Sequence, residues 1–216
     1  MYVPKQFAED RLEVLHATIA RTGLATLVTL GADGLNATHL PLVLDPQAGP
    51  FGTLFGHVAR GNPQWRDHMA SVEALAIFLG PEAYVSPSWY ATMRETGKVV
   101  PTWNYLTVHA YGSLMVYEDP RRLREHVERL TERQEAHRQD RWRLSDAPEE
   151  FVEGMLKGII GYELPISRIE GKWKMSQNRP DEDRLETIAG LEATARPAEQ
   201  AVAEVMRSLR PGQQSG

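Results

Sequence analysis

Four segments of this 216-residue chain concentrate side chains that could do chemistry. They are Thr38–Leu42, Gly56–Trp65, the pair Tyr84–Tyr90 and Val100–Tyr105, and Lys172–Arg179. Their cationic and amide groups suit an anion such as phosphate, because charged donors make strong hydrogen bonds to phosphate oxygens. Their aromatic rings with polar tips suit the wall of a pocket for a flat ring.

The segment Gly56–Trp65 has the features of a phosphate loop. A strand is expected to end there, Asn62 is a suitable N-cap, and Pro63 favours the first position of a helix. The first amides of a helix lack intrahelical partners and accept a phosphate readily. Arg60 would add a charge-assisted contact. The alternative is a capped surface helix whose arginine is solvated.

The aromatic and basic segments each allow two interpretations. Trp89, Tyr90, Trp103 and Tyr105 fall within 17 residues and suit a ring-binding wall, a core or a subunit interface. Segment Lys172–Arg179 holds two lysines, an arginine and several neutral donors. That density of donors could clamp a phosphate, or it could be a solvated turn.

The histidines indicate neither a metal site nor a catalytic group. His39, His57 and His109 could act as acid or base, but a lone histidine on a strand is more often structural. The seven histidines show no metal-ligand spacing. The absence of cysteine excludes disulfides and thiolate metal sites, and a reducing cytosol is the natural compartment. We therefore expect a cytoplasmic protein with no metal and no assigned catalytic residue.

The charge pattern argues against broad binding to nucleic acid. The formal net charge is −5. Residues 118–143 contain eight arginines and seven acids, which favours a solvated amphipathic helix over a DNA-binding face. No helix-turn-helix pair is recognisable, and no apolar run is long enough to span a bilayer.

Hydrophobic periodicity predicts six helices. Asp119 caps the helix that begins at Pro120, and Asp146 with Glu149 resembles a capping box for the next. The predicted helices are Phe7–Thr22, Pro63–Ala70, one from Pro120, one from Asp146 to near Gly158, Asp183–Glu192 and Pro197–Leu209. The last six residues, PGQQSG, are expected to be disordered.

Apolar runs between turn signals predict a set of short strands. Asp33-Gly34 is a hairpin signal, and Pro41 marks an edge or a bulge. The predicted strands are Leu24–Leu30, Leu35–Leu44, Phe51–His57, Val72–Leu79 with a continuation at Ala83–Ser86 after a break at Gly80-Pro81, Trp103–Tyr117 and Ile159–Ile169. This order fits a β-rich α+β fold, a small antiparallel barrel with helices packed at its edge.

Together the segments resemble the PaiB family of FMN-binding regulators over about Met1–Pro180. The marks of the resemblance are MYVP at 1–4, HLPL at 39–42, GHVARGNPQW at 56–65, AYVSPSWY at 83–90, VPTWNY at 100–105, VHAYG at 108–112 and GKWKMSQNR at 171–179. One such string is weak, but the full set in this order is specific.

The resemblance implies a split β-barrel akin to the pyridoxamine phosphate oxidases and flavin reductases. It implies a homodimer with FMN sites between the subunits, and a role in negative transcriptional regulation. The barrel domain would span residues 1–180, with a helical insertion at about 119–158. Residues 181–216 would form a C-terminal helical tail.

By motif position the resemblance also implies four groups of flavin contacts. The phosphate loop would use His57, Arg60, Asn62 and Gln64, and the isoalloxazine would lie along His39, Leu40, Pro41 and Leu42. Wall residues would be Thr102, Trp103 and Asn104, and the closing strand would add Lys174, Gln177 and Asn178. The loop lacks the paired basic residues of the oxidases, so we expect modest FMN affinity.

Two alternatives to an FMN-binding regulator stay open at this point. One is a flavin-dependent oxidase or reductase of a small substrate, in which the flavin carries the redox chemistry. The other is a structural dimer that has kept the barrel without the cofactor. No sequence feature names a substrate or an operator.

Overall fold

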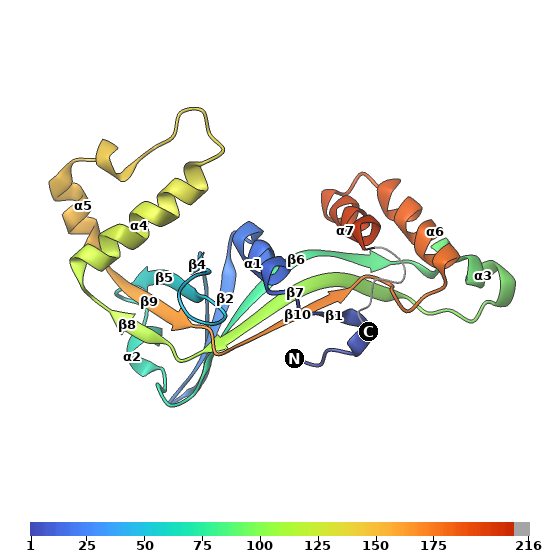
Figure 1. Cartoon of the computed structure of the whole chain (residues 1–216), viewed down its shortest axis with the longest axis horizontal. Coiled ribbons are helices and arrows are strands. Elements are labelled where there is room, and N and C mark those ends of the chain that lie inside the picture. The colour runs from blue at the N-terminus through green and yellow to red at the C-terminus, as the bar shows by residue number, and fades with distance from the viewer. Residues whose placement is uncertain (210–216) are drawn as a thin grey trace. The chain divides into compact units, whose positions relative to one another are not determined.

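The computed structural model describes residues 1–209 (Figure 1). They form two compact units, each assembled from separate stretches of chain. Unit 1 contains Met1–Leu15, Leu79–Val108 and the residues from Glu170 onward, and unit 2 contains His16–Phe78 and His109–Ile169. Three strands, β6, β7 and β10, run through both units.

The strands form two sheets. The larger has the order β1-β10-β7-β6-β2-β3, and the smaller has the order β4-β5-β9-β8. The strands are β1 Ala8–Glu9, β2 Ala25–Gly31, β3 Gly34–Leu40, β4 Val43–Asp45, β5 Thr53–Ala59, β6 Ala74–Val85, β7 Thr102–Gly112, β8 Met115–Tyr117, β9 Ile159–Pro165 and β10 Arg168–Lys174. Every pair whose register is known is antiparallel.

Short and long helices flank these sheets. The α-helices are α1 Leu12–Arg21, α2 Gln64–Asp67, α3 Ala91–Thr96, α4 Pro120–Glu135, α5 Glu149–Leu156, α6 Asp181–Glu192 and α7 Pro197–Ser208. Single 3-10 turns are η1 Lys5–Phe7, η2 Pro87–Trp89 and η3 Leu144–Asp146. Within the described residues, no helix is both long and apolar enough to cross a membrane.

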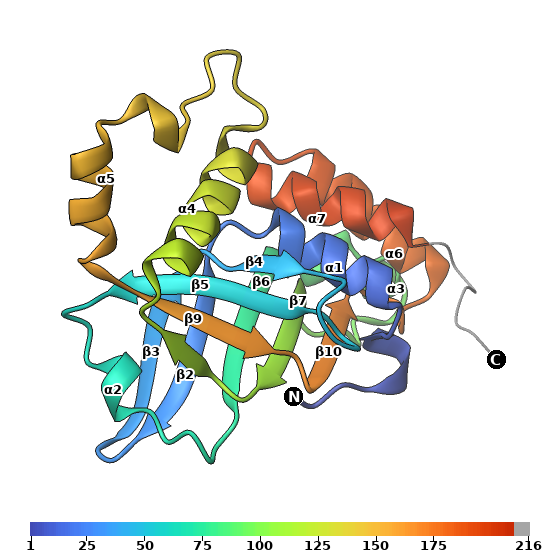
Figure 2. The same ribbon diagram turned by 60° about the vertical axis from the view of Figure 1, so that its left-hand side comes forward.

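Unit 2 is built on hairpins. The β2–β3 turn contains Gly34, whose φ of 114° is a conformation that glycine adopts without strain. Helix α4 packs against α5 and β9, as Figure 2 shows, and begins with the predicted cap of Asp119 on the amide of Arg122. A buried apolar cluster of Tyr117, Leu123 and the α5 side chains holds these helices to the sheet.

Unit 1 contains the C-terminal helices. Helices α6 and α7 lie side by side, and α3 lies against α6 (Figures 1 and 2). Asp183 of α6 is 1% exposed and accepts hydrogen bonds from the backbone amide and the hydroxyl of Thr92 in α3, both at 2.9 Å. Val202 and Met206 of α7 are fully buried, so the apolar stripe of the tail packs inside this unit.

Three predicted element boundaries are wrong for identifiable reasons. Strand β6 continues through Gly80-Pro81, because a Cβ at residue 80 would collide with Leu106 and a glycine allows that close approach. The predicted strand Trp103–Tyr117 divides after Gly112 into β7 and β8, which belong to different sheets. Likewise, residues 159–169 contain a turn between β9 and β10.

The N-terminal and insertion helices also differ from prediction. The chain before α1 forms η1 and β1, so the first helix starts at Leu12. The Asp146 carboxylate accepts from the amide of Arg143 within η3, and the residue that precedes α5 is Pro148. The predicted capping box of Asp146 with Glu149 is therefore not formed. The predicted disordered end, PGQQSG, lies outside the described residues, and the 1–180 domain boundary stays a prediction.

Candidate functional site

The predicted phosphate loop follows β5, and its arginine already has protein partners. Arg60 Nη1 lies 2.5 Å from Glu118 Oε2, and Arg60 Nε donates to the Lys157 carbonyl at 2.8 Å. Both carboxylate and guanidinium are partly exposed, so this ion pair costs little to rearrange. Lys157 and Glu118 engage Nε and Nη1 of Arg60, so an anion would compete with Glu118 for this guanidinium or would bind through Nη2.

The helix at this loop is too short to provide the predicted anion-binding end. Helix α2 has four residues, where the prediction was Pro63–Ala70, and Pro63 has no N–H to offer. The amide of Asn62 donates to Ala59, and the amide of Gln64 donates to Asn62 Oδ1 at 2.9 Å. Few backbone donors therefore remain for a phosphate.

Gln64 is an internal link in unit 2. It is 1% exposed, and its Nε2 donates to the Leu27 carbonyl at 3.2 Å and to Thr29 Oγ1 at 3.1 Å. Its Oε1 has no hydrogen-bond partner among the described residues. A buried acceptor needs a donor, which a phosphate dianion does not have. Of the flavin, only the N–H of the ring or a ribityl hydroxyl would suit this oxygen.

Strand β3 ends at Leu40, directly before Pro41, the residue that was expected to mark an edge or a bulge in the predicted strand Leu35–Leu44. Leu40 and Leu42 are buried, Pro41 lies between β3 and β4, and His39 is exposed on the outer face of β3. His39 Nδ1 is hydrogen-bonded to Thr26 Oγ1 at 3.0 Å. The Leu42 carbonyl accepts from Arg133 at 3.0 Å, so this stretch offers a ligand mainly His39 and the backbone edge of β3.

His57 is hydrogen-bonded to His126, a residue that the sequence did not single out. Its Nδ1 is 3.0 Å from Nε2 of His126 on α4; His126 is buried and His57 is half-buried. Burial lowers the pKa of His57, and burial together with the charges of His57 and Arg129 lowers the pKa of His126 to about 4. Two neutral imidazoles share this bond, which makes the pair a link between β5 and α4.

The residues predicted on β7 and β10 do come together, in unit 1. Lys174 Nζ donates to Thr102 Oγ1 and to the Trp103 carbonyl, both at 2.5 Å. The hydroxyl of Ser176 donates to Asn104 Oδ1 at 3.1 Å, and Asn104 is fully buried. Lys174, Thr102 and Trp103 are therefore neighbours at the surface, whereas Asn104 lies beneath it.

Positive charge collects around Lys174 without a carboxylate to balance it. Within residues 1–209, neither Lys172, Lys174 nor Arg179 forms an ion pair with an acid. Burial, and then the charges of Lys172 and Arg179, lower the pKa of Lys174. A bound anion would relieve this repulsion, so the donor set fits a phosphate or another anionic group.

An exposed ring adjoins this basic group. The Trp103 side chain is 53% exposed, and its ring makes an edge contact with Tyr84 at a centroid distance of 6.1 Å. Exposed indole next to a cation is a suitable surface for a flat aromatic ligand. Gln177, by contrast, uses both side-chain atoms inside its own turn, and Asn178 is exposed.

The candidate residues thus form two groups, one in each unit. In unit 2 they are Arg60, His39 and the orphaned oxygen of Gln64, and in unit 1 they are Lys174, Thr102 and Trp103. The chemistry of both sets fits FMN, which needs cationic partners for phosphate and flat or polar partners for the ring. The assignment of each residue to the cofactor stays a prediction.

Comparisons with known proteins agree with this chemistry. Residues 1–168 match the family described as "Putative FMN-binding domain". The chain is 35% identical over 206 residues to the "Protease synthase and sporulation protein PAI 2" of Bacillus subtilis, which covers 95% of this chain and 96% of that protein.

Solved structures show the fold. A flavocytochrome from Azotobacter vinelandii aligns with a TM-score of 0.58 at 12% identity, over 77% of this chain and 69% of its own. An FAD and heme binding protein from Mycobacterium smegmatis aligns with a TM-score of 0.57 at 17% identity, over 81% of this chain and 76% of its own. The predicted split barrel with flanking helices is confirmed.

Proposed function

This chain belongs to the PaiB family of FMN-binding proteins, and from that premise we propose that it binds FMN with the basic and aromatic group of unit 1 as a principal contact. The observation that carries the proposal is Lys174, a half-buried cation without an acidic partner among residues 1–209, next to the exposed Trp103. An uncompensated cation of this kind favours an anionic ligand.

Each side chain would have a distinct task. Lys174 would supply positive charge to the anionic part of the cofactor, with its ammonium oriented by Thr102 and the Trp103 carbonyl. Trp103 would cover a ring face and exclude water from it. Bound FMN would supply one- and two-electron redox chemistry. The alternative oxidoreductase function rests on that capacity, since the chain itself names no substrate.

We also propose that the protein acts as a homodimer with its flavin sites at the subunit interface. The outer face of the unit 2 sheet supports this, because it presents apolar side chains that no described residue covers completely. Directly opposed positions of β3, β2 and β6 put them on one face: Leu35, Ala37, Leu30, Val28, Leu75 and Ile77. Leu35 is 80% exposed, which is costly for a monomer.

A regulatory role, if direct, would not use helix α4 as a DNA-binding face. Three of its arginines are matched by carboxylates on neighbouring elements: Arg122 with Glu163, Arg124 with Glu149, and Arg129 with Asp45. Paired arginines release few phosphate counterions and give little affinity for DNA. We therefore propose regulation through the flavin state or a protein contact. The cytoplasmic location stays a prediction.

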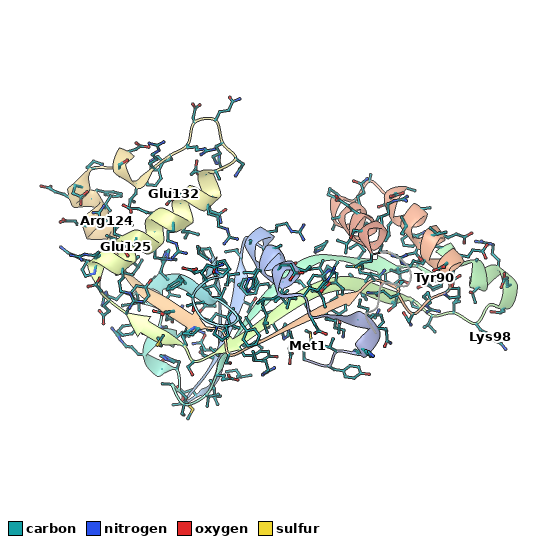
Figure 3. All side chains as sticks on the ribbon, viewed as in Figure 1. Met1, Tyr90, Lys98, Arg124, Glu125 and Glu132 are labelled. Carbon is teal, nitrogen blue, oxygen red and sulfur yellow. The ribbon has the colours of Figure 1, made fainter. Side chains whose placement is uncertain are left out.

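FMN titration followed by quenching of flavin fluorescence tests the proposal. Wild-type protein should bind about one FMN per chain. Lys174→Met should weaken binding by the ~1.5–3 kcal/mol of a charged hydrogen bond. The matched control is Lys98→Met, because Lys98 points away from the ribbon beyond α3 in Figure 3.

Riboflavin separates the two parts of the cofactor. If Lys174 contacts the phosphate, the variant should bind riboflavin as the wild type does, and if it contacts the ring, both ligands should weaken. Equal FMN affinity of Lys174→Met and wild type would contradict the assignment. Absence of quenching by the wild type would favour a barrel that has lost its cofactor.

A further inference from the structure

Unit 2 contains a cavity whose lining includes none of the residues that were assigned to the flavin. Its volume is about 290 Å³, and it lies between α1, β4 and α4. Apolar side chains form most of its wall, namely Ala17, Ala20, Val43 and Leu44, while His16 and Arg133 are its polar members. At about 30 Å³ per water molecule, this space equals on the order of ten waters. It is large enough for a small organic molecule.

Arg133 gives the cavity its charge. From α4 it donates to the Leu42 carbonyl at 3.0 Å, to the Ile19 carbonyl at 3.3 Å and to the Ala20 carbonyl. No acidic side chain of the described residues pairs with it, and burial lowers its pKa without any acid acting in the opposite direction. Among the described residues, the guanidinium therefore has backbone carbonyls as its hydrogen-bond partners.

The geometry of Arg133 leaves part of its donor capacity open. A guanidinium carries five N–H groups, and three of them serve the carbonyls of Leu42, Ile19 and Ala20. His16 uses its Nε2 on the Phe51 carbonyl at 2.9 Å, so that nitrogen is not open to an anion. A carboxylate is the group that would both accept the remaining N–H bonds and neutralise the charge.

We propose that this cavity binds a small amphiphilic carboxylate, with its apolar chain against α1 and β4 and its carboxylate on Arg133. The apolar wall and the guanidinium of Arg133, which has no acidic partner among the described residues, favour this class over neutral or cationic molecules. The volume matches a medium-chain fatty acid. The site is independent of the proposed FMN function, so either can fail alone.

Titration calorimetry of the full chain with octanoate tests the proposal. Octanoate should bind saturably at one per chain, and octanamide, which has the same chain without the charge, should bind at least about tenfold more weakly. Arg133→Gln should weaken octanoate by a similar factor. Equal binding of the two ligands would overturn the role of Arg133.

A second variant is needed because Arg133 also holds α1 and β4 together. Ala20→Leu fills the cavity mouth from an exposed helix position and leaves Arg133 in place, so it should abolish octanoate binding while thermal stability is kept. Ala189→Leu on α6, an exposed position in unit 1, is the control and should bind normally.

Three results would overturn the proposal. The first is that octanoate does not bind saturably at millimolar concentration. The second is that Ala20→Leu binds octanoate as the wild type does, and the third is that binding disappears as the protein concentration rises. The last result would assign the cavity to contact with a second copy of the chain. FMN titration of the same samples shows whether the flavin function fails or survives separately.

Discussion

At the scale of single residues, the structure divides the predicted ligand contacts into side chains with open donors and side chains committed to the fold. Lys174 and Trp103 keep a charge and a ring at the surface. Asn62 and Gln64 instead tie the loop after β5 to the strands of unit 2. Sequence motifs could not separate these roles, because an amide in a loop suits a ligand and a backbone carbonyl equally well.

A substitution of Gln64 tests whether this side chain serves the fold or a ligand. Gln64→Met should lower the free energy of unfolding by about 2–3 kcal/mol, because it leaves the Leu27 carbonyl and the Thr29 hydroxyl without their buried donor. Urea unfolding at one fixed pH measures the change. Gln47→Met, at an exposed position of a turn, should cost almost nothing. A Gln64 variant as stable as the wild type would make this residue primarily a ligand contact.

At the scale of elements, polar pairs join helices to a neighbouring strand or helix. His57 and His126 connect β5 to α4, and Asp183 connects α6 to α3. Such pairs involve residues 69 and 91 positions apart in sequence, so no local pattern reveals them. Their strength depends on protonation and on geometry that only the packed helices supply.

The histidine pair predicts a loss of stability in mild acid. The pKa of His126 falls from 6.5 to about 4 on folding, so below pH 6.5 the unfolded chain binds a proton that the folded chain refuses. Stability should be unaffected by this group above pH 6.5 and should fall by about 2 kcal/mol at pH 5. Urea unfolding between pH 7.5 and 5 should show a flatter profile for His126→Leu. The exposed His137→Gln should follow the wild type; equal slopes in all three proteins would contradict the prediction.

The hydrogen bonds of Asp183 should contribute measurably to the free energy of unfolding, because they link α6 to α3. Asp183 is buried, and Asp183→Ala removes the acceptor of two hydrogen bonds from Thr92, so we expect a loss of about 2–4 kcal/mol of unfolding free energy. Thermal unfolding monitored by circular dichroism measures it. Glu182→Ala, an exposed neighbour on the same helix, is the matched control. A change no larger than that of the control would mean that apolar packing alone holds the tail helices.

At the scale of the whole molecule, the chain leaves one apolar sheet face of unit 2 open to solvent. Leu35→Arg places a charge on that face and should convert a dimer to a monomer, because burying an unpaired guanidinium opposes association. Size-exclusion chromatography with light scattering measures the mass. Leu185→Arg, at an exposed position on α6, should leave the mass unchanged. A monomeric wild type would refute the proposed interface. A monomeric Leu35→Arg variant that still binds FMN would show that the flavin site does not lie at that interface.

The sequence by itself determined the family through its set of motifs, and that resemblance implied the split barrel. It also determined the hairpin at Asp33-Gly34 and the long helix capped by Asp119, because turn residues, helix caps and alternating patterns act over a few neighbouring positions. Only the tertiary structure decided that Trp103–Tyr117 serves two sheets, that Gly80 lets a strand pass beside Leu106, and that His57 faces His126. The same holds for Arg133 and its cavity. Each of these depends on which distant side chains meet, and a buried contact or an uncompensated charge is a property of the packed chain rather than of any segment.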